Sequence, residues 1–387
     1  MAIPLKYNRR SLLLRRVSNL MTAGGIALVV AVFVIVMALV TGLETAISES
    51  GSPHNMIILA RGADSEADSS LGLDQLDALK FLKGIGHDRA GNPLVSPELA
   101  EQIFMDSESG SLDVLLVRGV EPVALTVHDK VHITAGRMFA PSFGEVIVGK
   151  SIVGRYPGSV LGSSIRFGRR TWKVVGVFEA GGTSFESEVW CDVHDLQKDT
   201  NRDASFSDVR LRLAPGADLA ALVGRVADDP RINLEAESEL EYYREQSESG
   251  ARLRILGLFV AGIMALGAVF AAMNTMYAAV SARTREIGVL RALGFGRSAI
   301  MSSFLLESTL LAVAAGIIGV VLALPIREFS ATFNSGIAAA TLAFDFRVTF
   351  AIAIQALLFA ALIGIAGGWL PARQAMRMEI VDSLRKT

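Results

Sequence analysis

Cysteine and histidine are scarce in this chain, and two common catalytic motifs are missing from it. Cys191 is the single cysteine among 387 residues, which excludes an intramolecular disulfide and a zinc site made of several cysteines. One tight polar group, Asp192 with His194 and Asp195, is more typical of a turn than of a metal site. The sequence contains no HExxH or GxSxG motif. We therefore expect no catalytic residue, metal site or cofactor in this chain.

Charged residues are almost absent from four long apolar runs. Ionised side chains are costly at the centre of a bilayer, and a helix needs roughly 20 apolar residues to cross it. Three runs contain no charged residue, and the fourth contains Glu307 alone. The mean hydropathy of +0.44 agrees with a membrane protein. The sequence predicts four transmembrane helices, at residues 20–42, 255–282, 298–326 and 348–370.

Basic residues are distributed unevenly around these spans. Five lysines and arginines and no acid precede the first span, and four arginines face one acid, Glu286, between the second and third spans. By the positive-inside rule, both termini and residues 283–297 lie in the cytosol. Residues 43–254 then form a large extracytoplasmic domain, residues 327–347 a short extracytoplasmic loop, and residues 371–387 a cytosolic tail.

The N-terminal residues 1–19 mix leucines with basic side chains. This pattern suits an amphipathic segment on the inner membrane surface, although an ordinary basic flank explains it equally well. A cleaved signal peptide is disfavoured, because the apolar run is longer than the roughly 7 to 15 residues of such a signal. We expect this run to remain as a membrane anchor.

The large insert between the first two spans has two textures. Its ends alternate between strand and helix patterns, whereas its middle, about residues 107–205, consists of short runs rich in valine, isoleucine and aromatics between glycine and proline turns. This arrangement predicts a β subdomain inserted into a split α+β unit. The strands expected at the two ends are 55–60, 207–213 and 232–236, and the helices are 73–82 and 218–227.

Residues 235–254 precede the second span and contain many acids and no proline. They predict a helical stalk that continues into the membrane; a solvated linker is the alternative. The predicted fold is thus an α-helical membrane protein with four transmembrane helices and a large α+β extracytoplasmic domain.

The cytosolic segment 283–297 has the pattern of a short docking helix. On a helical wheel Ile287, Leu290 and Leu293 share one broad face, and Glu286 falls within the same arc. A helix lying on lipid would not place an acid there, so the pattern favours a groove on a partner protein. Gly294 then ends the helix.

Glu307 is the one ionisable residue well inside a predicted span. An intramembrane charge is a candidate functional residue. A contact with a neighbouring helix or hydroxyl group is the simpler interpretation, and a direct role in transport is the alternative.

Three stretches of this sequence resemble the MacB/FtsX-like ABC transporter permeases, a family that includes macrolide-exporter and lipoprotein-releasing permeases. They are MNTMYAAVSARTREIGVLRALGFGR at 273–297, AGRMF at 135–139 in the insert, and WLPARQAMRMEIVDSLRK at 369–386. The closing signature of the family usually carries proline where Ile380 stands here.

The resemblance implies a permease dimer of four-span chains, each with a split porter-like α+β unit that carries an inserted β subdomain. Segment 283–297 would be the coupling helix that docks on a nucleotide-binding subunit, and Glu307 matches the acid of the family's third span. The resemblance also implies that ATP and magnesium would be bound by that separate ATPase. The residues implied to contact the ATPase are Arg285, Glu286, Ile287, Gly288, Leu290, Arg291, Leu293 and Gly294.

The function implied is that of a permease subunit that couples ATP hydrolysis to movements of the extracytoplasmic domain and so drives export of a substrate. Two alternatives stay open: a permease-like regulator of an envelope enzyme, and a subunit of a lipoprotein-releasing complex. The expected partners are an ABC ATPase, a second permease copy, a periplasmic adaptor and membrane lipids, with no nucleic acid. The expected location is the bacterial inner membrane.

Overall fold

The computed structural model describes residues 16–229, 232–248, 250–335 and 340–378, which belong to two compact units. The first, here named the helix unit, comprises Met1–Thr41, Arg252–Phe329 and Phe346–Thr387. The second, the sheet domain, comprises Gly42–Ala251 and Ser330–Asp345. Most of the predicted amphipathic segment 1–19 and the end of the tail, with Ile380, lie outside the described residues.

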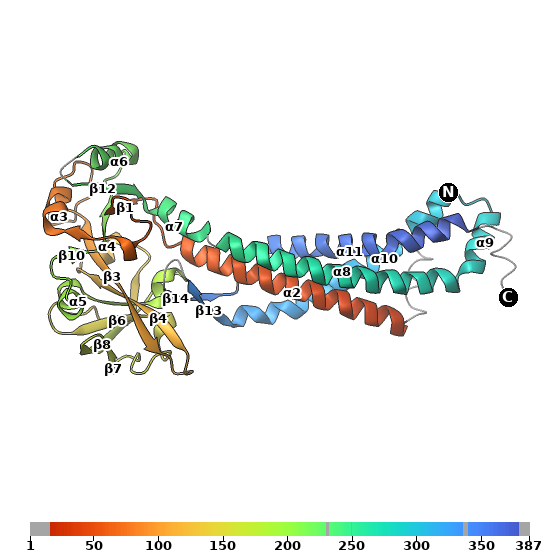
Figure 1. Ribbon diagram of the computed structural model, residues 1–387, viewed down its shortest axis with the longest axis horizontal. Coiled ribbons are helices and arrows are strands. Elements are labelled where there is room, and N and C mark those ends of the chain that lie inside the picture. The colour runs from red at the N-terminus through yellow and green to blue at the C-terminus, as the bar shows by residue number, and fades with distance from the viewer. Residues whose placement is uncertain (1–15, 230–231, 249, 336–339, 379–387) are drawn as a thin grey trace. The chain divides into compact units, whose positions relative to one another are not determined.

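Four helices of the described chain are long and apolar enough to cross a membrane (Figure 1). The prediction of four long apolar helices is therefore confirmed. Helix α11 continues through Pro371, so the first residues of the predicted cytosolic tail are helical. The four helices are α2 Arg16–Ser48, α8 Gly250–Ala282, α10 Arg297–Ala323 and α11 Phe350–Arg377.

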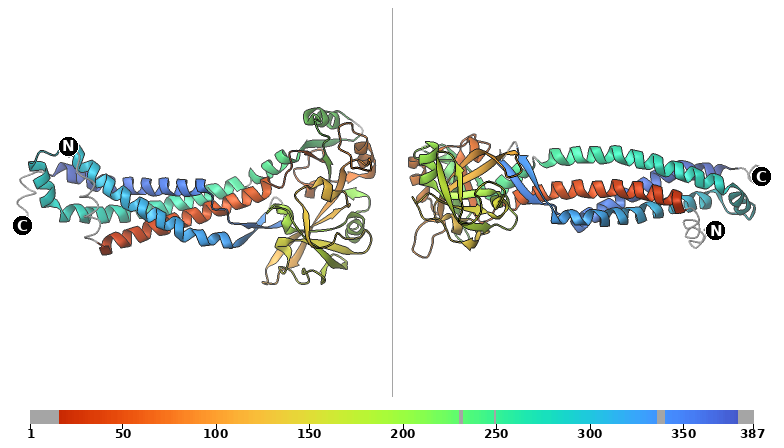
Figure 2. Two further views of the ribbon diagram at one scale, coloured as in Figure 1. Left: turned by 180° about the vertical axis from the view of Figure 1, so that it is seen from behind. Right: turned by 90° about the horizontal axis from the view of Figure 1, so that it is seen from below.

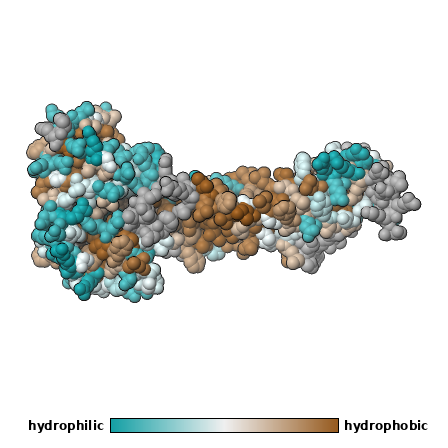
Figure 3. Space-filling model, in the orientation of Figure 1, coloured by the Kyte–Doolittle hydropathy of each residue, from teal (hydrophilic) through white to brown (hydrophobic). Residues whose placement is uncertain are grey.

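Small residues let the helices of the helix unit pack closely. A Cβ atom at Gly319 of α10 would lie 2.5 Å from the carbonyl oxygen of Ala27, and one at Gly364 of α11 would lie 2.7 Å from the Cβ of Ala312. Backbone approach at small residues is typical of transmembrane helix pairs. Large apolar side chains, such as Phe259 at 65% exposure, cover the outer surface of the unit (Figure 3). This distribution fits a unit whose solvent is lipid.

The sheet domain is built on one ten-stranded mixed sheet in the order β12-β1-β11-β3-β4-β9-β6-β8-β5, with β7 paired to β8. The pairs β4–β9 and β6–β8 are parallel. Its strands are β1 Asn55–Ala60, β3 Val95–Asp106, β4 Leu112–Val120, β5 His132–Gly136, β6 Glu145–Gly149, β7 Ser164–Phe167, β8 Arg170–Glu179, β9 Glu188–Asp192, β11 Asp208–Arg212 and β12 Leu234–Ser238. A separate pair is formed by β2 Leu71–Gly72 and β10 Ser205–Phe206.

Short helices cover this sheet and complete one hydrophobic core. Three of these helices each contribute a leucine that is buried in one cluster with strand residues such as Val117 and Val209; the leucines are Leu79, Leu196 and Leu222. The helices are α3 Leu73–Lys80, α4 Ala124–Val127, α5 Val193–Thr200, α6 Leu219–Asp228 and α7 Glu239–Glu248, and the 3-10 turns are η1 Glu66–Asp68, η2 Lys150–Ile152 and η3 Ser184–Ser187.

Strand β3 joins the two textures that the sequence distinguishes. Its first residues pair with β11 of the split α+β part, and Leu99–Asp106 pair with β4 of the predicted β subdomain. The predicted large α+β domain is therefore present, with its two parts sharing a strand and a core.

The predicted stalk begins at Glu239 and not at residue 235, because residues 235–238 belong to β12. Leu234 and Ala236 are buried while Glu235 is exposed, which is the period of two that a half-buried strand requires. Two acids of the predicted stalk, Glu235 and Glu237, therefore belong to a strand, whereas the acids from Glu239 onward lie in α7.

The loop predicted at 327–347 is a β-hairpin that belongs to the sheet domain (Figure 2). Its strands, β13 Ser330–Ser335 and β14 Ala340–Asp345, follow the 3-10 turn η4 Leu324–Glu328. The amide of Val114 donates to Thr341 Oγ1 at 3.0 Å, and the amide of Ala343 donates to Ser187 Oγ at 2.9 Å. These two bonds hold β14 against β4 and η3.

Candidate coupling site

A short helix, α9 Thr284–Ala292, follows α8 and precedes α10 (Figure 1). Gly294 has φ of +91°, a left-handed conformation that glycine adopts without strain, and α10 begins three residues later at Arg297. The segment predicted as a docking helix is therefore helical and ends where its glycine predicts.

Ile287 anchors α9 to its own helix unit. Its side chain is 2% exposed and packs in one apolar cluster with residues of the three neighbouring helices. Gly288 is also buried. Of the predicted contact residues, these two thus face inward. The cluster consists of Met276 and Val280 of α8, Ile300 and Phe304 of α10, and Ala372 and Ala375 of α11, with Ile287.

The other predicted contact residues lie on the outward side of α9. Arg285, Glu286, Leu293 and Gly294 are exposed, with Leu293 at 70%, whereas Leu290 and Arg291 are half-buried. Val289 is also exposed, although the sequence analysis does not include it. A helical wheel that takes Ile287 as the buried position would have identified Val289, because it lies on the opposite side. The exposed stripe consists of Arg285, Glu286, Val289 and Leu293.

Two polar contacts fix the ends of α9. Nη1 of Arg283 lies 3.0 Å from Oε2 of Glu307, and the two side chains are 11% and 7% exposed. Nη1 of Arg291 donates to the carbonyl oxygen of Met376 in α11 at 3.1 Å. Glu307 is therefore in an ion pair with the residue at the α8–α9 junction, and the sequence analysis does not predict this partner.

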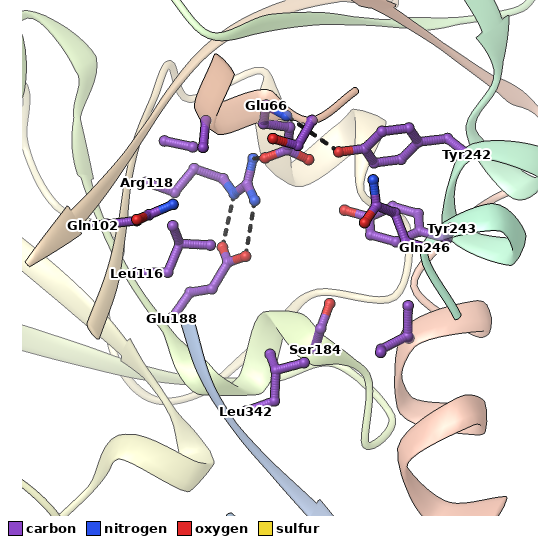
Figure 4. Close-up of a pocket in the computed structure, with 14 residues that line it drawn as sticks. Glu66, Gln102, Leu116, Arg118, Ser184, Glu188, Tyr242, Tyr243, Gln246 and Leu342 are labelled. Atoms are coloured by element: carbon purple, nitrogen blue, oxygen red, sulfur yellow. Dashed lines mark hydrogen bonds and ion pairs between the residues drawn. The ribbon is translucent and has the colours of Figure 1, made fainter. Parts of the chain in front are cut away.

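A second candidate site is a small cavity of about 70 Å³ inside the sheet domain (Figure 4). On one wall Arg118 makes a bidentate contact with Glu188, with nitrogen–oxygen distances of 2.7 and 2.8 Å, and its Nη1 lies 2.8 Å from Glu66. The rest of the lining combines apolar and aromatic side chains, such as Leu116, Tyr242 and Leu342, with polar ones, such as Gln102 and Ser184.

A second buried arginine, Arg210, extends this polar cluster. It contacts Glu66 at 2.5 Å, Asp208 at 3.0 Å and the carboxylate of Glu239 at the start of α7. Burial and the charge of Glu66 raise the pKa of Asp208 well above its usual value. Burial would also raise the pKa of Glu98, but the nearby His128 and Arg210 outweigh it, and this pKa is lowered. The cluster thus ties strands β3, β4, β9 and β11 to α7.

The described parts of the chain contain no group of three or more His, Cys, Asp or Glu that could hold a metal ion. The polar group noted in the sequence is a helix cap, since Oδ1 of Asp192 accepts from the amide of Asp195 at 3.0 Å at the start of α5. His194 lies 3.3 Å from Gln197. The group therefore lies at the start of helix α5 rather than in the expected turn.

The structure defines a multi-pass membrane protein. It has four membrane-length helices, a mixed-sheet domain inserted between the first two, and a short helix between the second and third. The MacB-like periplasmic core domain family matches residues 20–229, and the FtsX-like permease C-terminal family matches residues 258–380. The chain belongs to the MacB/FtsX-like family of ABC transporter permeases. Its sheet domain is the periplasmic or extracellular domain of that family.

The chain is similar to the following individual proteins. The chain is 23% identical to the uncharacterized ABC transporter permease YknZ of Bacillus subtilis over 97% of this chain and 96% of that protein. It is 36% identical to the macrolide export ATP-binding/permease protein MacB of Bordetella avium over 35% of this chain, a match that covers 20% of the MacB protein. Its structure is also similar to the crystal structure of the periplasmic region of MacB from Actinobacillus actinomycetemcomitans. That match covers 52% of this chain and 95% of the other chain, at 11% identity and a TM-score of 0.39.

Proposed function

We propose that this chain is the permease subunit of an ABC transporter that receives movement from a separate ATPase through α9 and passes it to the sheet domain. The movement drives export or extrusion of a substrate across the cell envelope. The observation that carries the proposal is the construction of α9: one side is anchored by Ile287 among three helices, and the other exposes Arg285, Glu286, Val289 and Leu293.

The exposed stripe combines charged and apolar side chains. Two side chains of opposite charge, Arg285 and Glu286, fix the position in which a partner protein binds. Val289 and Leu293 supply apolar surface that the partner buries. A surface of this kind suits a protein groove better than lipid, where the charges would be unsatisfied. The anchored side of α9 suits the transmission of force, because a close-packed contact moves as one body.

The source of free energy is a partner protein. Residues 144–151, GEVIVGKS, have the spacing of a phosphate-binding loop, but residues 145–149 form strand β6 and the side chain of Lys150 is paired with Glu179. The permease YknZ aligns with this chain along almost its whole length. In the proposed topology both termini and α9 lie in the cytosol of a bacterium, where an ATPase can reach them. Two permease copies, each with an ATPase, form the working unit, and a periplasmic adaptor and membrane lipids complete its surroundings.

Movement reaches the sheet domain along the chain itself. Helix α2 contributes residues to both units, and α7 leads toward α8 while its first residue, Glu239, is held by the buried Arg210. The arginine–carboxylate cluster makes the base of α7 rigid with respect to the central strands. A change at α7 is therefore passed to the sheet rather than absorbed locally.

Co-purification of the permease with its candidate ATPase tests this proposal. The variants Glu286→Lys and Leu293→Asp should lose the ATPase, because they reverse a charge and place an acid on the exposed stripe. The matched control is Phe81→Asp, which changes a side chain of 86% exposure in the sheet domain in the same way. Equal ATPase recovery for the wild type and all three variants would refute the assignment of α9.

A further inference from the structure

The ion pair between Arg283 and Glu307 joins two different parts of the helix unit. Arg283 stands between α8 and α9, whereas Glu307 lies ten positions into α10. Both side chains are almost fully buried, and their charged atoms are 3.0 Å apart. Charges in such surroundings are costly unless they are paired, so this contact strongly restrains the position of α9 relative to α10.

The covalent link between α9 and α10 is much less restraining than the ion pair. It runs from Leu293 to Gly296 and contains two glycines, one of them in the left-handed conformation. A displacement of α9 would be lost in such a turn if the turn were its sole connection to α10. Ile287 packs in one apolar cluster with Ile300 and Phe304 near the start of α10. The ion pair adds a contact between charged groups that connects the start of α9 with a position deeper in α10.

Helix α10 is in turn packed closely on α11. A Cβ at Gly316 would lie 2.7 Å from the Cβ of Ala360, and one at Gly364 would lie 2.9 Å from the carbonyl oxygen of Ser308. Arg291 adds a direct bond from α9 to the Met376 carbonyl oxygen of α11. The two helices therefore respond to α9 as a pair.

The segment that joins α10 to α11 is the β13–β14 hairpin, which belongs to the sheet domain. Thr341 and Ala343 of this hairpin bond to Val114 and Ser187. A displacement of the helix pair thus has a covalent path to the sheet domain that does not involve α2 or α8.

We infer that Arg283 and Glu307 are positioning residues that make α10 and α11 move with α9, so that ATP-driven movement reaches the sheet domain through the β13–β14 hairpin as well as through α8. This inference rests on the proposed function. Glu307 is assigned no contact with a transported substrate; it acts through Arg283 on α9. Removal of the pair should leave the exposed stripe of α9 intact and interrupt transmission to the hairpin.

The test uses the full permease with its ATPase in lipid nanodiscs, with a fluorophore on a cysteine introduced at the exposed Thr332 of β13. Three quantities are measured: ATPase binding, ATP hydrolysis, and the ATP-dependent change of the Thr332 fluorescence. In Glu307→Gln we expect binding to persist and the fluorescence change to fall about fivefold or more, the lower end of typical coupling free energies. Arg283→Lys, which keeps the charge, should retain most of the change.

Two further variants separate transmission from a general loss of structure. The double exchange Arg283→Glu with Glu307→Arg restores a pair of opposite charges and should recover the fluorescence change that each single exchange abolishes. The control Glu179→Gln removes a carboxylate from the exposed pair of Lys150 and Glu179, whose atoms are 2.8 Å apart, and should change nothing.

The outcomes distinguish this inference from the proposed function. An unchanged fluorescence response in Glu307→Gln, or no recovery in the double exchange, would overturn the role of the pair. Failure of the wild-type permease to bind an ATPase would instead overturn the proposed function.

Discussion

At the scale of single residues, the two buried arginines of the sheet domain show how much one side chain can hold together. Arg118 and Arg210 reach carboxylates on strands that are far apart in the sequence, such as Glu98 of β3 and Glu188 of β9. Each arginine has its burial cost offset by several charge-assisted hydrogen bonds. Loss of one arginine would leave carboxylates buried without a partner.

Arg118→Leu should therefore destabilise the protein by about 3–5 kcal/mol, the usual effect of breaking a buried pair. Arg137→Leu removes a pair with Glu145 at 2.6 Å, in which the arginine is 58% exposed, and should cost under about 1 kcal/mol. Thermal unfolding of the two purified variants measures the difference. Similar losses of stability would show that burial does not decide the energetics of this cluster.

Glu237 of β12 gives a pH-dependent prediction. Burial and its acidic neighbours, Glu245 first among them, raise its pKa to about 7. Because this folded-state pKa lies above the unfolded value, the folded protein binds more protons between the two values. The stability contributed by the protonated carboxyl is present at low pH and is lost as the pH rises through about 7.

Glu237→Gln should accordingly stabilise the protein at pH 8 by roughly 1 kcal/mol, a value reduced for the half-exposed position. The gain should vanish near pH 4.5. Melting temperatures of the wild type and the variant across this pH range provide the test. A gain that does not depend on pH would show that relief of charge is not its cause.

At the scale of elements, contact between α10 and α11 depends on positions where only glycine fits. A Cβ at Gly364 meets Ala312 at 2.7 Å and the Ser308 carbonyl oxygen at 2.9 Å, whereas a Cβ at Gly262 of α8 meets nothing within 4 Å. Gly364→Ala should cost about 1–3 kcal/mol through overpacking. Gly262→Ala should be neutral or stabilising by up to about 1 kcal/mol. Thermal unfolding of both variants in detergent measures this, and equal effects would contradict the close packing.

The sequence predicts elements well where one physical pattern dominates. Four uncharged or nearly uncharged runs predict the four long helices, and a short, mostly apolar run predicts β1 at residues 55–60 with the bounds observed. It fails where two patterns coincide. Residues 235–238 contain helix formers, but the pairing of β12 with β1 decides their conformation.

The candidate site is predictable in part for the same reason. The helix α9 and its terminating glycine follow from local sequence, so both are predicted. Two other features depend on packing between helices that are distant in the sequence: the inward direction of Ile287 and the pairing of Glu307 with Arg283. A helical wheel describes one helix alone and so predicts neither feature. The β13–β14 hairpin escapes prediction because its partners, Val114 and Ser187, lie more than a hundred residues earlier.

At the scale of the whole molecule, the proposed topology separates two exposed side chains that are otherwise comparable. Leu293 lies on α9, and Phe81 lies in the sheet domain. In inside-out membrane vesicles a membrane-impermeant thiol reagent should label Leu293→Cys and not Phe81→Cys, and the pattern should reverse in right-side-out vesicles. Labelling of both positions from one side would contradict the topology.

The native cysteine does not interfere with such experiments. Cys191 is buried, and burial together with Asp192 raises the pKa of its thiol well above the usual value. The reactive thiolate is therefore suppressed. Introduced cysteines on α9 can be modified selectively.

The central claim is that the exposed stripe of α9 is the contact for the ATPase, and site-specific crosslinking tests it most directly. Full-length permease with Leu293→Cys or Val289→Cys is reacted with a short bifunctional thiol-to-amine crosslinker in membranes that contain the candidate ATPase, and Phe81→Cys serves as the control. We predict permease–ATPase adducts from both α9 positions and none from the control. Co-purification of the ATPase without a crosslink from either α9 position would contradict this account.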